Sequence, residues 1–232
     1  RVLFRSTADA SQIDPRIVGK VTWTPYLQSA EGPCGGTQPV HNVTQDVYFT
    51  TIQGAIDGAE AGDLIEVAAG TYEENVSIDV AVDLRGPNYN INPNAGSRSG
   101  EAIICYPENM TASEPDSWAP LVYVEADEVA INGFTINDDN YESSVDYSYF
   151  TAIAAHESAN FKASNNIVEG FNYISILPYQ GNPAETPIDG VEVTNNLVKD
   201  NYGLYHSVYI QGVGGIVSGN TIENCGGAIQ IQ

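Results

Sequence analysis

Positive charge is scarce in this sequence. Lys and Arg number 8 among 232 residues, against 30 Asp and Glu, which gives a formal net charge of −22. Neither Lys nor Arg occurs between Arg98 and Lys162. Such a chain repels phosphate backbones and anionic headgroups, so we expect neither nucleic-acid binding nor membrane-surface binding. The acids indicate a solvated acidic surface or, as the alternative, a site for a divalent cation.

Cysteine and long apolar runs are scarce as well. Cys34, Cys105 and Cys225 lie far apart, with no Cys-x-x-Cys motif. The count excludes a disulfide framework and allows one bridge, without saying which cysteines would form it. No apolar run reaches the roughly 18 residues of a membrane span, so membrane insertion is not expected. What the chain has is 42% hydrophobic residues, enough for a continuous core, and 14 Tyr against 6 Phe, which fits an extracellular protein.

Both ends of the sequence bear on its extent. Residues 1–6, Arg-Val-Leu-Phe-Arg-Ser, resemble the translation of a sequencing adapter, as found at the ends of metagenomic fragments; six native residues that match by chance are the alternative. Residues 226–232 stop within an alternating strand pattern, and an open strand edge invites aggregation. We therefore expect a fragment of a longer protein, truncated at its C-terminus, with any secretion signal or anchor outside it.

A repeat organises the second half of the chain. Four segments align without gaps: residues 131–137, 163–169, 193–199 and 217–223. Their fourth positions hold Phe134, Asn166, Asn196 and Asn220, at spacings of 32, 30 and 24 residues, which suits solenoid coils with loops of varying length. Asn tolerates the left-handed backbone of a sharp corner, and stacked coils place successive amides about 4.8 Å apart. We predict a hydrogen-bonded ladder of Asn166, Asn196 and Asn220, which begins at Phe134; ordinary loop asparagines are the alternative.

A short alternating strand lies near each repeat segment. These strands are expected at residues 151–155, 173–176, 207–211 and 228–232. No helical periodicity separates them, which argues against a βαβ fold and favours an all-β solenoid. Alternation predicts one buried face, made of Ile153, Ile174, Ile176, Val208, Ile210, Ile229 and Ile231.

The first half carries a different pattern, which resembles a known family. Thr51 is expected to cap a short helix that buries Ile52, Ala55 and Ile56, and strands are expected at 64–67, 76–78 and 82–84. The segment TIQGAID…AGDLIEVAAGTYEENVSI…VDLRG resembles the opening coil of the pectin-lyase-like superfamily, and with the repeats the resemblance covers about residues 45–232. It implies a right-handed parallel β-helix with a short N-terminal capping helix. It does not specify an activity, since enzymes and adhesins share the motif.

The domain organisation follows from the same resemblance. Residues 17–27 resemble the closing segment found after β-helix domains in large surface proteins. We therefore expect residues 7–40 to be the tail of an upstream β-helix unit, or else an N-terminal extension, and residues 41–232 to be the β-helix itself. Tandem neighbouring domains and a secreted or cell-surface location are implied.

The outward positions beside the buried rows predict a candidate ligand surface. Tyrosine rings can stack on sugar faces, while Gln and Ser can hydrogen-bond to hydroxyl groups. A glycan groove is therefore one interpretation, and an ordinary solvated sheet face is the other. The groove candidates are His156, Tyr173, Ser175, Ser207, Tyr209, Gln211 and Gln230, with His206 beside them.

Catalytic and metal-binding patterns are less specific. Lyases of this fold need a base and commonly acid-bound calcium, but the basic candidates are few, and Lys162 is expected on the strand opposite the groove. Asp138, Asp139 and Asp146 form either a solvated turn or a calcium site. The pair Asp138-Asp139 resembles the Asp-Asp of polygalacturonases, yet the partnering Gly-His-Gly and Arg-Ile-Lys segments are absent from this sequence. Catalytic residues stay unassigned.

Two hypotheses of function follow. The first is a structural or adhesive module of a large secreted or surface protein that binds polysaccharide or cell-surface glycan, with no cofactor other than the calcium considered above. The alternative is a polysaccharide lyase or glycoside hydrolase acting on uronate-type polymers, with an incomplete active site in this fragment. Basic residues on the groove face of further coils would favour the enzyme, and many repeated β-helix units would favour the adhesin.

Overall fold

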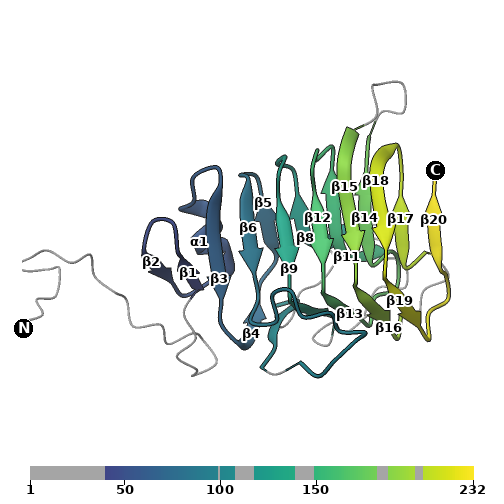
Figure 1. Ribbon diagram of the computed structural model, residues 1–232, viewed down its shortest axis with the longest axis horizontal. Coiled ribbons are helices and arrows are strands. Elements are labelled where there is room, and N and C mark those ends of the chain that lie inside the picture. Colours follow the sequence, from purple (N-terminus) through teal and green to yellow (C-terminus); the bar gives the residue numbers. More distant parts are fainter. Residues whose placement is uncertain (1–39, 99, 108–117, 139–148, 182–187, 202–205) are drawn as a thin grey trace, which may run out of the picture.

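The computed structural model describes residues 40–98, 100–107, 118–138, 149–181, 188–201 and 206–232, which form an all-β structure. Three sheets of mostly parallel strands run side by side along one axis (Figure 1). From β3 onward, each turn of the chain adds one strand to sheet A, one to sheet B and one to sheet C. Six such turns, which we number coils 1–6, give a solenoid-like arrangement compatible with a parallel β-helix.

Sheet A has eight strands, and its first two form a hairpin at the N-terminal end. β1 pairs antiparallel with both β2 and β3, whereas every later neighbour in this sheet is parallel. The strands are β1 (Val40–Asn42), β2 (Val47–Phe49), β3 (Asp63–Val67), β6 (Val82–Arg85), β9 (Ala130–Asn132), β12 (Lys162–Ser164), β15 (Ile188–Thr194) and β18 (Val213–Ser218).

Sheets B and C have six parallel strands each. Sheet B consists of β4 (Gly70–Glu73), β7 (Ala102–Cys105), β10 (Thr135–Asn137), β13 (Ile167–Glu169), β16 (Leu197–Lys199) and β19 (Thr221–Glu223). Sheet C consists of β5 (Val76–Ile78), β8 (Trp118–Val124), β11 (Tyr149–His156), β14 (Ile176–Tyr179), β17 (Val208–Ile210) and β20 (Ile229–Ile231).

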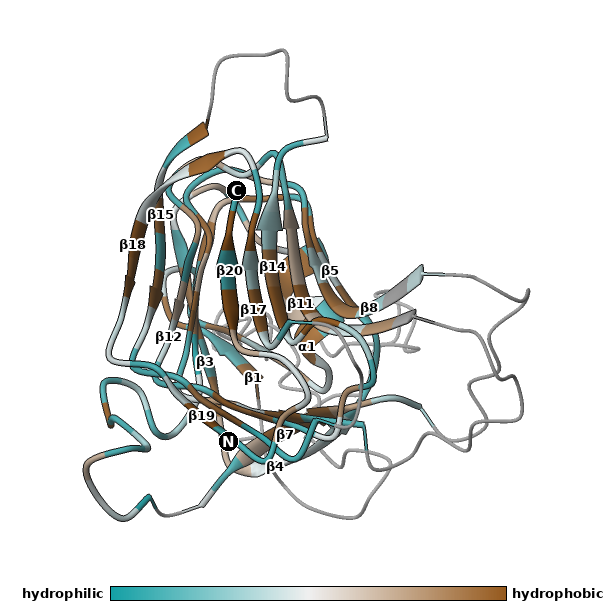
Figure 2. Cartoon of the chain, turned by 90° about the vertical axis from the view of Figure 1, so that its right-hand side faces the viewer, coloured by the Kyte–Doolittle hydropathy of each residue, from teal (hydrophilic) through white to brown (hydrophobic). Residues whose placement is uncertain are grey.

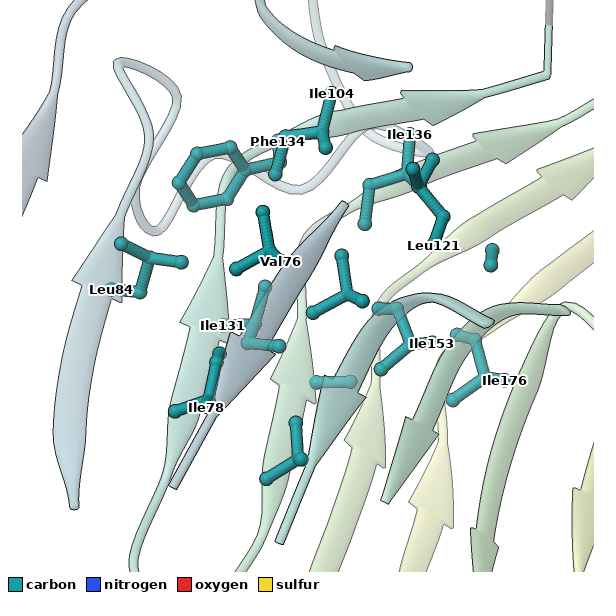
Figure 3. Close-up of a cluster of buried hydrophobic side chains, with 14 of the residues drawn as sticks. Val76, Ile78, Leu84, Ile104, Leu121, Ile131, Phe134, Ile136, Ile153 and Ile176 are labelled. Atoms are coloured by element: carbon teal, nitrogen blue, oxygen red, sulfur yellow. The ribbon is translucent and has the colours of Figure 1, made fainter. Parts of the chain in front are cut away.

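The interior of the solenoid is filled by apolar side chains from all three sheets (Figure 3). Figure 2 shows residues of high hydropathy, in brown, along strands of all three sheets. Parallel pairing in register places equivalent residues of successive coils one above another, about 4.8 Å apart. Each such side chain, when fully buried, stabilises the fold by about 2 kcal/mol. In sheet A, one continuous row of fully buried residues consists of Ile65, Leu84, Ile131, Ala163 and Val193.

The described residues include one helix, α1 (Ile52–Asp57), which lies near β1, β2 and β5 at the N-terminal end. Thr51 caps it, since its Oγ1 accepts a hydrogen bond from the backbone N of Gly54 at 3.0 Å. The buried face of the helix consists of Ile52, Ala55 and Ile56.

A glutamine of this helix completes the edge of sheet C. Gln53 Nε2 donates to the carbonyl of Ser77 at 3.1 Å, and Gln53 Oε1 accepts from Ser77 N at 2.7 Å. The side-chain amide therefore takes the place of a neighbouring strand, and these backbone groups of β5 are paired at an otherwise open edge.

The opposite end of the described chain is uncovered. Ile216 is 56% exposed, Ile229 42% and Ile231 65%. The predicted burial of Ile229 and Ile231 is therefore wrong, because within the described residues no strand follows β20. The other residues predicted for this face are buried, namely Ile153, Ile174, Ile176, Val208 and Ile210.

Asparagines are stacked at the corner between sheets A and B. Asn196 Oδ1 accepts from the backbone N of Asn166 at 2.9 Å and from its Nδ2 at 3.2 Å. Asn220 Oδ1 does the same for Asn196, at 2.9 and 3.0 Å. Phe134 N donates to Asn166 Oδ1 at 3.0 Å. The ladder therefore ends at Phe134, which occupies the equivalent position of its repeat.

The left-handed backbone lies one residue before each ladder position. Positive φ angles occur at Gly133 (87°), Asn165 (56°), Asn195 (57°) and Gly219 (67°). The expectation that the stacked asparagines themselves adopt this conformation is wrong. The corner residue is the Gly or Asn that precedes each of them, and the stacked side chain serves to pair backbone groups.

Residues 86–98, which we call the strap, leave coil 2 after β6 and run along the corner of later coils; Figure 1 shows this loop in dark teal at the lower edge. Asn90 N donates to Asn132 Oδ1 of coil 3 at 3.1 Å. Asn94 Nδ2 donates to the carbonyls of Asn196 and Gly219, in coils 5 and 6, at 3.3 and 3.1 Å. The strap therefore joins coils that are not adjacent.

Arg98 anchors the strap. Its side chain is 5% exposed, binds both carboxylate oxygens of Glu101 at 3.1 and 2.8 Å, and donates from Nη1 to the carbonyl of Asn165 at 2.7 Å.

Arg98→Ala should lower the free energy of unfolding by about 2 kcal/mol, because charged hydrogen bonds to half-buried partners are lost. Urea unfolding measures this. Lys162→Ala removes an exposed ion pair with Glu192 and should cost less than about 1 kcal/mol; equal midpoints for both variants would contradict the anchoring role.

Candidate functional site

The outer face of sheet C carries a cluster of aromatic side chains. In the register of the sheet, Tyr123 pairs with Ala154, and Ala154 pairs with Leu177. One step further, His156 pairs with Tyr179, and Tyr179 bridges to Gln211. Because Ile153 and Ala155 face the core, these residues point outward. Ala154 is nevertheless fully buried, so neighbouring side chains cover it.

Trp118 lies across this cluster. Its ring meets Tyr123 edge to face, with centroids 5.9 Å apart, and meets Tyr179 in the same way at 5.6 Å. Its Nε1 donates to Thr151 Oγ1 at 3.0 Å, which fixes the indole, yet 38% of the residue stays exposed. His156 stacks between Tyr123 and Tyr179, at 6.5 and 4.8 Å. We call Trp118, Tyr123, His156 and Tyr179 the aromatic cluster.

An open cleft of about 230 Å³ adjoins the aromatic cluster. Apolar and aromatic surface predominates in its lining, with the amide of Gln211 as a polar group that can hydrogen-bond. The lining residues are Trp118, Tyr173, Ile174, Leu177, Tyr179, Tyr209 and Gln211. A flat ring with apolar faces and polar edges, such as a sugar, suits this combination.

The hydroxyl of Tyr123 lies within the aromatic cluster, 3.4 Å from Nδ1 of His156. Burial raises the pKa of Tyr179, and the hydroxyl of Tyr123 and the charges of Glu125 and Glu157 raise the pKa further. Burial also raises the pKa of Tyr123, against the opposing effect of Tyr179. Both phenols therefore stay neutral well above physiological pH.

The structure divides the predicted groove residues into two groups. Tyr173, Tyr209 and Gln211 line the cleft, and His156 belongs to the aromatic cluster. Gln230 pairs in register with Tyr209 on the next strand, and the ring of His206 lies 5.5 Å from that of Tyr209.

Ser175 and Ser207 do not present their hydroxyls on this face. Ser175 is 0% exposed and accepts a hydrogen bond from Asn201, and Ser207 is 2% exposed and donates to the carbonyl of Gly227 at 2.7 Å. The reason is a shift of the strand. β14 begins at Ile176 rather than at Tyr173, so residues 173–175 belong to a corner, where polar side chains satisfy backbone and side-chain groups.

Sequence reasoning missed the residues that dominate the site. Trp118 and Tyr123 are on β8, which precedes the aligned repeats, and Tyr179 follows Pro178, a residue that weakens a strand prediction. The signal for β8 was the short apolar run of residues 121–124, Leu-Val-Tyr-Val. Tyr179 could have been found from its position three residues after the buried Ile176, because alternation along a strand places such a residue on the outward face.

The predicted calcium ligands fall mostly outside the described residues. Asp139 and Asp146 lie there, and Asp138 is half-buried, with its carboxylate packed over Gly170. Within the described residues, no three His, Cys, Asp or Glu side chains are grouped closely enough to hold a metal ion. Among the described residues, Cys105 and Cys225 form no disulfide, and Cys34 lies outside the described part of the chain.

Each Lys or Arg that the structure describes is paired with a carboxylate. Lys162 Nζ lies 2.8 Å from Glu192 in sheet A, and Lys199 Nζ lies 2.5 Å from Glu169 in sheet B. Arg85 pairs with Asp83, and Arg98 pairs with Glu101. None of these cations belongs to sheet C, so within the described residues no Lys or Arg faces the cleft.

Comparisons of the chain with known proteins and structures found no relative. The chain matches no protein-family model, no curated protein and no solved structure. Among the described residues, no helix has the length and hydrophobicity needed to cross a bilayer.

Proposed function

We propose that this chain is a non-enzymatic glycan-binding module of a secreted or cell-surface protein, built as a right-handed parallel β-helix of the pectin-lyase-like kind. The observation that carries the proposal is the cleft beside the aromatic cluster. In this interpretation α1 caps the first coil, tandem neighbouring units extend the protein, and sheet C presents the ligand surface.

The aromatic side chains give the cleft the properties of a sugar platform. Trp118 lines the cleft with 38% of the residue exposed, so it is accessible to a ligand, and its hydrogen bond to Thr151 reduces the entropy lost on binding. Tyr209, on β17 of the same sheet, is half-buried and lines the same cleft. Two rings held by rigid strands can bind successive sugar residues of an extended chain.

Intrinsic fluorescence provides a direct test. The sequence holds two tryptophans, Trp23 and Trp118, so a Trp23→Phe background reports on Trp118 alone. Titration with soluble polysaccharides should change the emission of Trp118 and give saturable binding. In the wild-type background, Trp118→Ala should weaken affinity by about 30-fold, the loss expected for a central aromatic anchor, and isothermal titration calorimetry measures it.

Tyr48→Ala is the matched control. Tyr48 is 37% exposed, close to the 38% of Trp118, but it stacks on His41 in the β1–β2 hairpin of sheet A, away from the cleft on sheet C. Its replacement should leave affinity unchanged. If no polysaccharide binds, or if Tyr48→Ala and Trp118→Ala weaken binding equally, the glycan site on sheet C is wrong. Release of sugar products by the protein would instead support the carbohydrate-active enzyme.

A further inference from the structure

We infer that the cleft on sheet C selects glycans without negative charge, and that Glu125 and Glu157 are the residues that exclude uronates and sulfated sugars. This inference rests on the proposed glycan site and names its ligand class. It departs from the uronate-type polymers that the enzyme hypothesis requires.

The two carboxylates stand at one end of the aromatic cluster. Glu125 follows directly after β8, two residues beyond Tyr123 and on the same face of the chain, and Glu157 follows directly after β11. Glu157 Oε1 lies 3.7 Å from His156 Nε2, with 44% of its side chain exposed. His156 stacks on Tyr179 at 4.8 Å, Glu157 N donates to the carbonyl of Tyr179 at 2.9 Å, and Tyr179 lines the cleft, so the carboxylates place negative potential beside the ligand surface.

Within the described part of the chain, no Lys or Arg offsets this potential. Each of the four Lys and Arg residues in the described part of the chain is paired with a carboxylate on sheet A, on sheet B or beside the strap. His156 is the one basic group of the cluster, and it is stacked between two tyrosine rings beside Glu157. A sugar carboxylate placed on the rings would meet two like charges without a counterion, and such contacts provide specificity by repulsion.

Matched pairs of polymers test the selection. Hydroxyethyl cellulose and carboxymethyl cellulose share a backbone and differ in charge, as do methyl-esterified and free polygalacturonate. Where one of these pairs binds, we expect its uncharged member to have about 10-fold higher affinity than its anionic member at low ionic strength. Raising the salt concentration should shrink that ratio, since exposed charges are screened over about 8 Å at physiological ionic strength.

Charge removal assigns the effect to the two residues. The double variant Glu125→Gln/Glu157→Gln should bind the uncharged polymer as the wild type does, and should reduce the preference to about 2-fold. The control Glu60→Gln/Glu66→Gln removes the same two charges from exposed sites around β3, at the N-terminal end, and should keep the full preference.

The outcomes separate the two proposals. Anionic polymers that bind as tightly as uncharged ones, or a preference that survives Glu125→Gln/Glu157→Gln, would overturn the inference and leave the glycan site standing. A preference lost equally in the control variant would also overturn it, because net charge would then be the cause. Absence of binding to every polymer would overturn the glycan site and the inference together.

Discussion

Asn196→Ala should lower the free energy of unfolding by about 3 kcal/mol, one of the two largest effects that we expect from a single substitution in this chain. Asn196 is fully buried at the corner of coil 5. Its Oδ1 accepts from the backbone N of Asn166 at 2.9 Å, and its Nδ2 donates to the carbonyl of Ala163 at 2.9 Å. Alanine leaves both backbone groups buried without these partners, and each unsatisfied group costs about 1–3 kcal/mol.

Urea unfolding followed by far-ultraviolet circular dichroism measures this loss. Asn75→Ala is the matched control, since Asn75 is exposed and its Nδ2 makes one long hydrogen bond, 3.2 Å, to the carbonyl of Pro120. We expect its midpoint to stay close to that of the wild type. Equal midpoints for Asn196→Ala and Asn75→Ala would mean that the corner amides contribute nothing specific to stability.

Gly133→Ala should also destabilise the fold by about 3 kcal/mol. Gly133 has a φ of 87°, a conformation that costs an L-residue about 1–2 kcal/mol. A Cβ atom at this position would lie 2.4 Å from the carbonyl carbon of Asn88 and from the backbone N of Tyr89. Both atoms belong to the strap backbone, so the strap would have to move away from the coil and lose its contacts, a further penalty of overpacking.

Gly96→Ala is the control for the strap. Gly96 is in the same loop, has no left-handed φ, and an added Cβ would meet no atom within 4 Å. Its replacement should be neutral or slightly stabilising, because alanine restricts the unfolded chain. Thermal unfolding of the two variants gives the comparison. A melting temperature for Gly133→Ala at or above that of Gly96→Ala would show that the strap does not need this close approach.

The sequence predicted the corners of the solenoid well because they repeat. Each coil needs a side chain that pairs the backbone groups of the next corner. This need recurs along the chain, so it is visible as the spacing of Phe134, Asn166, Asn196 and Asn220 even though loop lengths differ. The left-handed backbone was assigned to the wrong residue. In two of the four repeats Asn occupies two consecutive positions, and the first of each pair, Asn165 or Asn195, has the positive φ angle.

The candidate site was predicted less completely because it does not repeat. Tyr173, Tyr209 and Gln211 were found by alternation within a strand, whereas Trp118 reaches the cleft through its long side chain from the first residue of β8. Alternation also gives no starting point for a strand, and one shifted start was enough to place Ser175 outside when it is buried. The ring contact between Trp118 and Tyr179 joins β8 to β14, two strands far apart in the sequence, and no local pattern contains such a contact.

The strap has a consequence for how the molecule comes apart. In a pure solenoid each repeat touches only its nearest neighbours, so coils can fray one at a time from an end. Asn94 bonds to Gly219, 125 residues away, and thereby closes a long loop around four coils. Loss of coil 6 alone therefore breaks contacts of coil 2 as well, and fraying becomes cooperative. During synthesis the same contacts cannot form until the later coils have emerged, so the strap docks last.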